Sequence, residues 1–430
     1  MQNYTAFSQD DLKATLEELN KSYSEIKAQG LSLNMARGKP CSEQLALSLP
    51  MLDCITSSDV LSATDGTDCR NYGVLEGIPE ARALMGVLLD EDPDNVIVLG
   101  NSSLTIEHDY INMCLQFGTL GSKPWNMLPE LKWLCPVPGY DRHFSMLQQY
   151  GITMIPVPMD ENGPDMDIVE DLVENDEYIK GIWCVPKYSN PTGATYSENT
   201  VKRLATMKTA AEDFRIFWDN AYTVHHLNNA LDEQECLSDI GKACAESGNS
   251  TRYLKFCSTS KITFPGAGIS AFGAAGAVLR EFKKYLGYQM IGADKLNMLR
   301  QVAFLKDAEH IATHMAKHAE LLKPRFNLVQ EVLSRELGDL GIAEWTNPRG
   351  GYFVSFTGLP NTAKRTVALA KEAGVVLTGA GATWPYGKDP EDSNIRIAPT
   401  YPSLEELGKA LEVFCCCAKI AACEALIEKE

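Results

Sequence analysis

The stretch Tyr253-Leu254-Lys255-Phe256-Cys257-Ser258-Thr259-Ser260-Lys261 joins an apolar run typical of a buried strand to a lysine that follows hydroxyl side chains. A glycine-rich turn, Gly266-Ala267-Gly268, comes next. Burial disfavours a charged amine, so a lysine in this position can lose its proton and attack a carbonyl. The serine hydroxyls can donate hydrogen bonds to phosphate oxygens. The stretch therefore predicts that Lys261 forms a Schiff base with a phosphorylated aldehyde cofactor.

Two upstream motifs indicate which aldehyde this is. Asp219 ends the apolar run 214–218, so its carboxylate would emerge at the carboxyl end of a buried strand, where open α/β sheets bind ligands. A carboxylate there would keep the ring nitrogen of pyridoxal 5'-phosphate protonated. Tyr222, three residues later, and Asn190, in Asn190-Pro191-Thr192-Gly193, could both donate to the phenolic oxygen of the same ring. The predicted cofactor is pyridoxal 5'-phosphate.

The order Asn-Pro-x-Gly, Asp-x-x-Tyr, Ser-x-Ser-Lys and then a late arginine, Arg396, resembles the fold-type I pyridoxal-phosphate aminotransferases of class I/II. The sequence around these motifs is similar to a divergent bacterial group of aspartate aminotransferases, and the resemblance runs from about Arg37 to Pro399. It implies an α/β fold with a mostly parallel seven-stranded sheet flanked by helices and a smaller α+β domain. It also implies transfer of an amino group between an amino acid, aspartate or glutamate, and a 2-oxo acid such as 2-oxoglutarate.

The resemblance assigns roles to further residues. Tyr140 would stack on the cofactor ring, and Tyr72 would reach the phosphate bound by the neighbouring subunit of a homodimer whose active site lies at the subunit interface. Arg396 would hold the substrate α-carboxylate with its bidentate fork, Gly38 would complete that site by close backbone approach, and Asn190 would also face the substrate. Each tyrosine could instead be an ordinary loop residue.

The phosphate end of the predicted site is less regular. Ser102 and Ser103 follow the apolar run 96–99 and would cradle the phosphate at a helix start, although serines in this position also serve as plain helix N-caps. The family has an arginine eight residues after the lysine, where this chain has Ile269. Lys187, Lys255 or helix-end N–H groups would then balance the phosphate. Arg37, Lys39 and Arg142 are the candidates for binding a distal carboxylate.

The pattern of elements predicts the domain organisation. Between residues 95 and 257, short apolar runs alternate with helical patterns, which is typical of a parallel sheet covered by helices on both faces. One of these helices is predicted over 197–213, and a first helix between Ser8 and Gly30 with a capping box at Ser8 and Asp11. We expect a large cofactor-binding domain over 51–324, and a small domain formed by 1–50 and 325–430.

Composition narrows the function class. The chain has 430 residues, 45% hydrophobic and 22% charged, as expected of a globular enzyme, and its net charge of −18 disfavours nucleic acid and anionic membranes as partners. No run of 18 apolar residues and no secretory leader pattern is present, so a cytoplasmic location is expected. The thirteen cysteines form no Cys-x-x-Cys pair, so no metal site is predicted and buried thiols are expected.

Three other functions were weighed against transamination. A pyridoxal-phosphate β-lyase or decarboxylase would use the same cofactor residues and differ in which Cα bond stands perpendicular to the ring. A ligand-sensing regulator built on the same domain would carry a basic DNA-binding extension, whereas here the pattern begins by Arg37 and the first helix is not basic. A structural protein without cofactor is opposed by the complete set of Lys261, Asp219 and Asn190.

Overall fold

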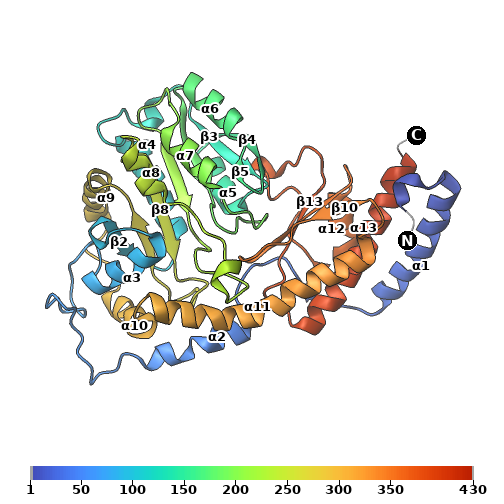
Figure 1. The fold of residues 1–430 in the computed structure, drawn as a ribbon, viewed down its shortest axis with the longest axis horizontal. Coiled ribbons are helices and arrows are strands. Elements are labelled where there is room, and N and C mark those ends of the chain that lie inside the picture. Colours follow the sequence, from blue (N-terminus) through green and yellow to red (C-terminus); the bar gives the residue numbers. More distant parts are fainter. Residues whose placement is uncertain (1–2, 429–430) are drawn as a thin grey trace.

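A large sheet forms the middle of the larger part of the computed structural model, which describes residues 3–428 (Figure 1). Its strands, in spatial order, are β2 (Val96–Leu99), β9 (Ser270–Gly273), β8 (Tyr253–Ser258), β7 (Arg215–Asp219), β6 (Ile179–Cys184), β3 (Lys132–Val137), β4 (Thr153–Asp160) and β5 (Gly163–Pro164). β9 runs antiparallel to β2 and β8, β5 runs antiparallel to β4, and the other neighbours are parallel. The predicted mostly parallel sheet is confirmed, but within residues 3–428 it has eight strands instead of the predicted seven, because the two-residue β5 extends its edge.

Alternating side chains assign the two faces of this sheet. Trp133 and Cys135 of β3 join one apolar cluster, whereas Leu134 between them joins another, because successive side chains of a strand point to opposite faces. Strands buried on both faces in this way are typical of parallel sheets covered by helices. The covering helices are α3 (Pro79–Leu89), α4 (Ser103–Phe117), α5 (Asp141–Gln149), α6 (Met166–Asn175), α7 (Glu198–Thr206), α8 (Ile240–Glu246), α9 (Gly276–Gln289) and α10 (Lys295–Leu305).

A second apolar cluster collects the beginning and end of the chain around smaller sheets. β10 (Ala343–Trp345), β11 (Val354–Gly358) and β13 (Asn394–Ile397) form an antiparallel sheet, and β1 (Leu33–Asn34) pairs in parallel with β12 (Val375–Val376). The helices of this part are α1 (Gln9–Ala28), α12 (Ala363–Glu372) and α13 (Leu404–Glu428). Figure 1 shows α1 and α13 side by side, so the two ends of the chain share one core.

The connections between the two parts are α2 (Ser42–Leu47) and the long helix α11 (Ala308–Leu337). Ile311 and Met315 of α11 pack in the core beneath α3 and α10, whereas Leu322 and Phe326 belong to the cluster of the chain ends. Pro324 lies inside the helix, between these two regions. Short 3-10 turns lie at Tyr4–Ala6, Leu49–Asp53, Pro93–Asn95, Trp125–Met127, Leu231–Glu233 and Pro385–Gly387. Among the described helices, none combines the length and apolar character needed to cross a membrane.

Two local predictions have different outcomes. The capping box is present, because the Ser8 hydroxyl accepts from the Asp11 N–H and the Asp11 carboxylate accepts from the Ser8 N–H. The helix predicted over 197–213 is wrong in its end, because α7 stops at Thr206. Beyond that point, the guanidinium of Arg252 donates to the carbonyl of Met207, and the carboxylate of Asp213 accepts from Lys180, so tertiary contacts replace helical hydrogen bonds.

Candidate functional site

The motifs predicted from the sequence meet in one cavity of about 200 Å³ at the carboxyl ends of the parallel strands. It is lined by Ser102, Ser103, Leu104, Tyr140, Val185, Asn190, Asp219, Ala221, Tyr222, Ser258, Ser260 and Lys261. Ser102 and Ser103 at the start of α4 follow β2, Tyr140 follows β3, Asn190 follows β6, Asp219 ends β7, and Lys261 follows β8. The cavity therefore collects residues from five strand ends, as the switch-point rule for open α/β sheets predicts.

Lys261 lies on the turn after β8, with its amine over the ring of Tyr222, 4.9 Å from the ring centroid. Burial lowers the pKa of this amine, and the charge of Asp219 opposes that effect in part. A lysine whose proton is held weakly is the form that attacks a carbonyl carbon. The amine therefore has the surroundings that covalent attachment of an aldehyde requires.

Asp219, which lines the same cavity as Lys261, ends β7 and belongs to a buried cluster of three ionisable side chains. Its Oδ2 lies 3.2 Å from Nε2 of His143 on α5, and the same nitrogen lies 3.4 Å from Oε2 of Glu107 on α4. The His143 ring stacks on Trp183, with centroids 4.0 Å apart and planes at 8°. The other oxygen of Asp219, Oδ1, is buried and has no hydrogen-bond partner among the described residues. That oxygen can accept from a protonated ring nitrogen, so the site fits a pyridine-type cofactor.

His143 stays charged in this cluster although burial alone would make it neutral. Burial would lower the pKa of His143, but the charge of Glu107 and the contact with Asp219 raise it to about 9. Burial raises the pKa of Glu107 to about 7, and the charge of Asp219 adds to this effect. His143 is therefore a cation at neutral pH. Neither residue belongs to the predicted motifs, although a carboxylate among the apolar residues of the α4 pattern is a signal that could have indicated Glu107.

Three polar side chains complete the cavity wall between Lys261 and Asp219. Burial holds the pKa of Tyr222 well above its usual range, so its hydroxyl stays a hydrogen-bond donor. The Asn190 amide oxygen accepts from Nη1 of Arg396 at 3.2 Å, which leaves the Asn190 NH₂ group for other acceptors. The Tyr140 ring packs edge-on against His143, with centroids 4.9 Å apart.

Arg396 extends the site into the smaller sheet, where β13 carries it. Its Nη1 donates to Oδ1 of Asp141 at 2.9 Å, and its guanidinium lies 4.8 Å from the centroid of the Phe353 ring. Gly38 has a packing reason, because a Cβ there would lie 2.2 Å from Cζ of Phe353. Any other residue at 38 would displace the ring under the guanidinium. Arg396 and Gly38 thus belong to one assembly beside the cavity.

The part of the cavity predicted to hold the phosphate is lined by serines at the start of α4 and at the end of β8. Ser102 stands at the N-cap position without a side-chain capping bond, so plain N-capping does not occupy its hydroxyl. Lys255, a candidate for balancing the phosphate, is instead paired with Asp239 at 2.7 Å and Glu91 at 3.2 Å. Lys187 is buried beside Tyr188 and does not line the cavity. Within residues 3–428, Lys261 is the only cationic side chain on the cavity wall.

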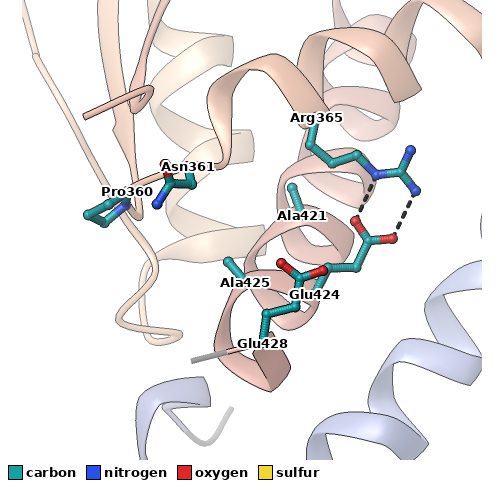
Figure 2. Close-up of a pocket in the computed structure, with 7 residues that line it drawn as sticks. All are labelled: Pro360, Asn361, Arg365, Ala421, Glu424, Ala425 and Glu428. Atoms are coloured by element: carbon teal, nitrogen blue, oxygen red, sulfur yellow. Dashed lines mark hydrogen bonds and ion pairs between the residues drawn. The ribbon is translucent and has the colours of Figure 1, made fainter. Parts of the chain in front are cut away.

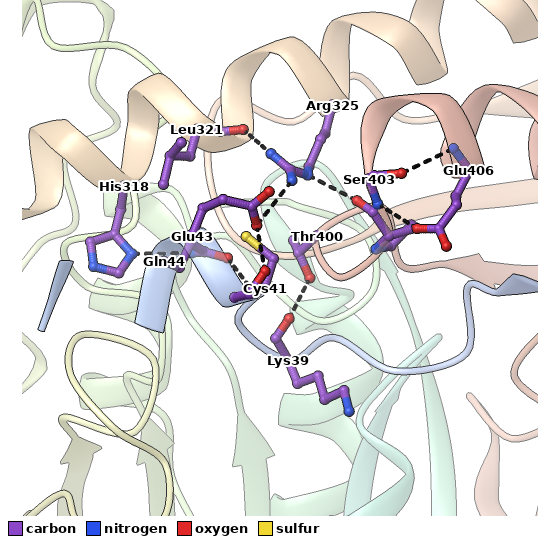
Figure 3. A network of polar contacts seen from close by, with 12 residues as sticks. Lys39, Cys41, Glu43, Gln44, His318, Leu321, Arg325, Thr400, Ser403 and Glu406 are labelled. Carbon is purple, nitrogen blue, oxygen red and sulfur yellow. Dashed lines mark hydrogen bonds and ion pairs between the residues drawn. The ribbon is translucent and has the colours of Figure 1, made fainter. Parts of the chain in front are cut away.

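Other predicted residues lie outside the cavity. Tyr72 is 83% exposed on the protein surface. Arg37, Lys39 and Arg142 are also exposed, and Nζ of Lys39 lies over the ring of Tyr401 at 3.9 Å. Figure 3 shows the Lys39 side chain pointing away from the polar network that its carbonyl joins through Thr400. The structure therefore assigns no distal-carboxylate residue among these three.

A group of neutral imidazoles lies behind the Lys261 turn. Nε2 of His225 lies 3.4 Å from the carbonyl oxygen of Lys261, and Nε2 of His314 lies 2.8 Å from that of Ile262. His318 follows at 3.1 Å from His314 and receives the Gln44 amide at Nδ1, a contact drawn in Figure 3. Burial lowers the pKa of His225 well below its usual range and that of His318 to about 3. These rings are uncharged at neutral pH.

A larger pocket, of about 560 Å³, opens elsewhere, between α12 and α13 (Figure 2). Its Arg365 is held by the carboxylate of Glu424 through two hydrogen bonds. None of the motif residues lines it, and its one described arginine is already paired, so its size does not indicate chemistry.

Comparison with known proteins agrees with the geometry. The sequence model of a family described as "Aspartate amino-transferase" matches residues 7–430. A putative aminotransferase of Mycolicibacterium smegmatis is 48% identical, with 99% of each chain covered, and an aspartate aminotransferase of Corynebacterium glutamicum is 45% identical, with 95% of this chain and 94% of the relative covered. The crystal structure of an aspartate transaminase from Corynebacterium glutamicum superposes with a TM-score of 0.95 at 43% identity over 99% of each chain.

Proposed function

Because this chain belongs to the aspartate aminotransferase family and is a transaminase, we propose that it transfers the amino group of aspartate or glutamate to a 2-oxo acid such as 2-oxoglutarate, with pyridoxal 5'-phosphate as cofactor. The observation that carries the proposal is the convergence of Lys261, Asp219, Asn190 and Tyr222 on one cavity. The family implies the cofactor, and the unpartnered Oδ1 of Asp219, in the cavity that Lys261 also lines, supports it.

Each residue that lines the cavity would have its own role in binding the cofactor or moving a proton. When bound, the cofactor would supply an electron sink for the bonds at the substrate Cα. Lys261 would be its covalent attachment point, and its Nζ, once free, would accept and return the Cα proton as general base and acid. Asp219 would hold the ring nitrogen through Oδ1, while Tyr222 and Asn190 would donate to the phenolic oxygen. Ser102, Ser103 and Ser258 would bind the phosphate, with Tyr140 against the ring.

Arg396 would orient the substrate. Its guanidinium can exchange the Asp141 carboxylate for that of an amino acid, because both are acceptors of the same fork. Holding the α-carboxylate in one place fixes which Cα bond faces the cofactor ring, and that choice separates transamination from β-elimination and decarboxylation. Gly38 and Asn190 would hold the guanidinium in place through Phe353 and a direct hydrogen bond.

The test is a spectrum and an assay on purified protein. Aspartate should remove the visible absorption band of the bound cofactor, and 2-oxoglutarate should restore it while glutamate forms. Ammonia or carbon dioxide in place of glutamate would identify a β-lyase or a decarboxylase instead. Absence of any visible band, with added pyridoxal 5'-phosphate giving none, would contradict the cofactor proposal.

We further propose a homodimer with the active site at the subunit interface. Tyr72, Tyr288 and Ile291 are 83%, 85% and 63% exposed, and Lys295 joins their two segments by donating to the carbonyl of Gly73. Such an apolar area on one face supports burial against a second copy. Tyr72 would then reach the partner's phosphate, and Tyr72→Ala should weaken cofactor retention in a dimer whose mass is measured by analytical ultracentrifugation.

Two other expectations remain proposals. All thirteen cysteines are free thiols, which supports a reducing cytoplasm as the location. The separation of the apolar clusters supports a large domain over 51–324 and a small domain from 1–50 and 325–430. Limited proteolysis that leaves a stable fragment near 51–324 would test that division.

A further inference from the structure

We propose that Glu107 is a positioning residue that acts through His143 on Asp219, and that it carries an exchangeable proton which leaves when a cationic ring occupies the cavity. The inference rests on the proposed function for the identity of that ring. It goes beyond it by adding a residue that touches neither cofactor nor substrate.

The geometry isolates Glu107 with one partner. Glu107 comes from α4, His143 from α5 and Asp219 from β7, and one nitrogen or oxygen of each lies within 4.8 Å of the other two. Both carboxylates approach the same atom, Nε2 of His143, at 3.4 and 3.2 Å. One N–H cannot align with two acceptors at once. Within residues 3–428, neither Glu107 oxygen and neither His143 ring nitrogen has a well-aligned hydrogen bond, so Glu107 and His143 interact mainly as neighbouring charges.

Charge counting explains why a proton is exchangeable. Glu107 is fully buried and His143 nearly so, against the flat face of Trp183. With Asp219 ionised and His143 protonated, the cluster is neutral only if Glu107 keeps its proton. An uncompensated charge in such a place is costly, so the proton stays. A positively charged ring nitrogen at Oδ1 of Asp219 adds one positive charge, and neutrality then requires Glu107 to release its proton to solvent.

The neighbouring groups support this assignment. The titratable side chains that face the cluster are Tyr140 from the turn before α5, Tyr222 after β7, and Cys257 and Lys261 from the end of β8 and the turn after it. Burial raises the pKa of Tyr140, Tyr222 and Cys257, so all three stay neutral. Burial lowers the pKa of Lys261, and its amine lies over the Tyr222 ring, outside the three-residue cluster. Glu107, with a pKa raised to about 7 by burial, is the group that titrates in the working range.

The first arm of the test measures His143 directly. The full-length protein, with ring-¹⁵N histidine, is titrated by NMR with its cofactor and after the cofactor is removed, and His143→Asn assigns the signal. Glu107→Gln keeps the shape and removes the charge, so the pKa of His143 should fall by about one to three pH units. Asp109→Asn changes a carboxylate on the same helix that faces Gln289, and should leave His143 unchanged. An unchanged His143 in Glu107→Gln would overturn the proposal.

The second arm measures the proton. Calorimetry of pyridoxal 5'-phosphate binding near pH 7, repeated in buffers of different ionisation enthalpy, should show less proton release in Glu107→Gln than in wild type. Equal release in both would overturn the exchange. If no cofactor binds to wild type, the proposed function fails, while the NMR arm on the cofactor-free protein still decides the coupling of Glu107 to His143.

One further variant and two further measurements test the role of Glu107 if the first two arms are not decisive. Glu107→Asp retains a carboxylate and should hold the pKa of His143 above that of the Gln variant, which a merely structural role would not require. Should Glu107→Gln not fold, infrared titration of the wild-type carboxyl decides: a pKa above about 6 supports the proposal and an ordinary value near 4.3 overturns it. In kinetics, kcat of Glu107→Gln should fall about tenfold with KM for aspartate unchanged, since Glu107 does not contact substrate.

Discussion

Histidines are buried on both sides of Lys261, and the two sides treat them in opposite ways. On the Asp219 side, His143 lies between two carboxylates, and its pKa is raised to about 9. On the far side, no carboxylate of residues 3–428 shifts the pKa of His225, His314 or His318, and burial lowers the pKa of each. Burial thus makes an imidazole neutral by default, and a specific acid is needed to keep one charged. We refer to His143 with its two carboxylates as the charged wall and to His225, His314 and His318 as the neutral wall, although none of these histidines is among the residues that line the cavity itself.

The largest expected effect comes from replacing Lys261. Lys261→Ala should lower turnover by at least about 10²–10⁴-fold, because the residue that moves the proton is lost. It should also let the pKa of His225 rise, because the Lys261 charge contributes to lowering it. Steady-state kinetics, with mass mapping after borohydride reduction, checks the first effect. Lys284→Ala, at an exposed position of α9, is the control, and a turnover equal to it would refute the role of Lys261.

The next prediction compares how much a histidine of the charged wall and a histidine of the neutral wall contribute to the free energy of unfolding. His143→Phe should lose about 3–5 kcal/mol, because it leaves two buried carboxylates without their cation. His318→Phe removes a neutral ring, so its loss should be smaller. Urea unfolding of both variants at pH 8, without substrate, provides the measurement. Equal losses would mean that His143 is neutral in the folded protein.

Lowering the pH should reduce the contribution of the neutral wall to the free energy of unfolding. His318 binds protons more weakly when folded, so its contribution to stability falls as pH drops from about 6.5 towards 3. The loss for this residue should reach about 2 kcal/mol at pH 5, and His318→Gln should recover most of it. His143 has the opposite sign: its contribution is complete below about 6.5 and is lost as pH rises through about 9. Unfolding free energies at pH 5, 7 and 9 would show both trends, and parallel pH profiles of wild type and His318→Gln would contradict the first.

The smallest effect concerns one hydrogen bond within the neutral wall. Tyr352→Phe removes the hydroxyl that accepts from the Gln44 amide at 3.0 Å, and should cost about 1 kcal/mol. Gln44 keeps His318 as an acceptor, so the pKa of His318 should not move. A loss of stability well above the cost of one neutral hydrogen bond would show that the Tyr352 hydroxyl stabilises the protein through more than its bond to Gln44.

Much of the fold and the convergence of the motifs could be predicted, because both depend on local patterns. Alternating apolar runs predicted the parallel sheet, and motifs placed after its strands had to meet at one edge. The roles of residues such as Asp219 and Tyr222 remain predictions. Glu107 and His143 were missed because a charged residue on a helix is usually solvated, and its burial depends on which helices pack together. Lys255 was misjudged for the same reason, since Glu91 and Asp239 are distant in sequence.

Pro324 gives the long helix α11 a weak point with a mechanical consequence. Proline has no amide hydrogen, so the carbonyl of Glu320 loses its intrahelical donor there. The segment before it is anchored in one apolar core and the segment after it in the other. We expect any rocking of Arg396 towards Lys261 to be absorbed as bending at this residue, with both flanking segments moving as rigid levers. Faster amide hydrogen exchange near Pro324 than in either flanking segment would show that α11 bends there, and uniform protection along α11 would exclude such a hinge.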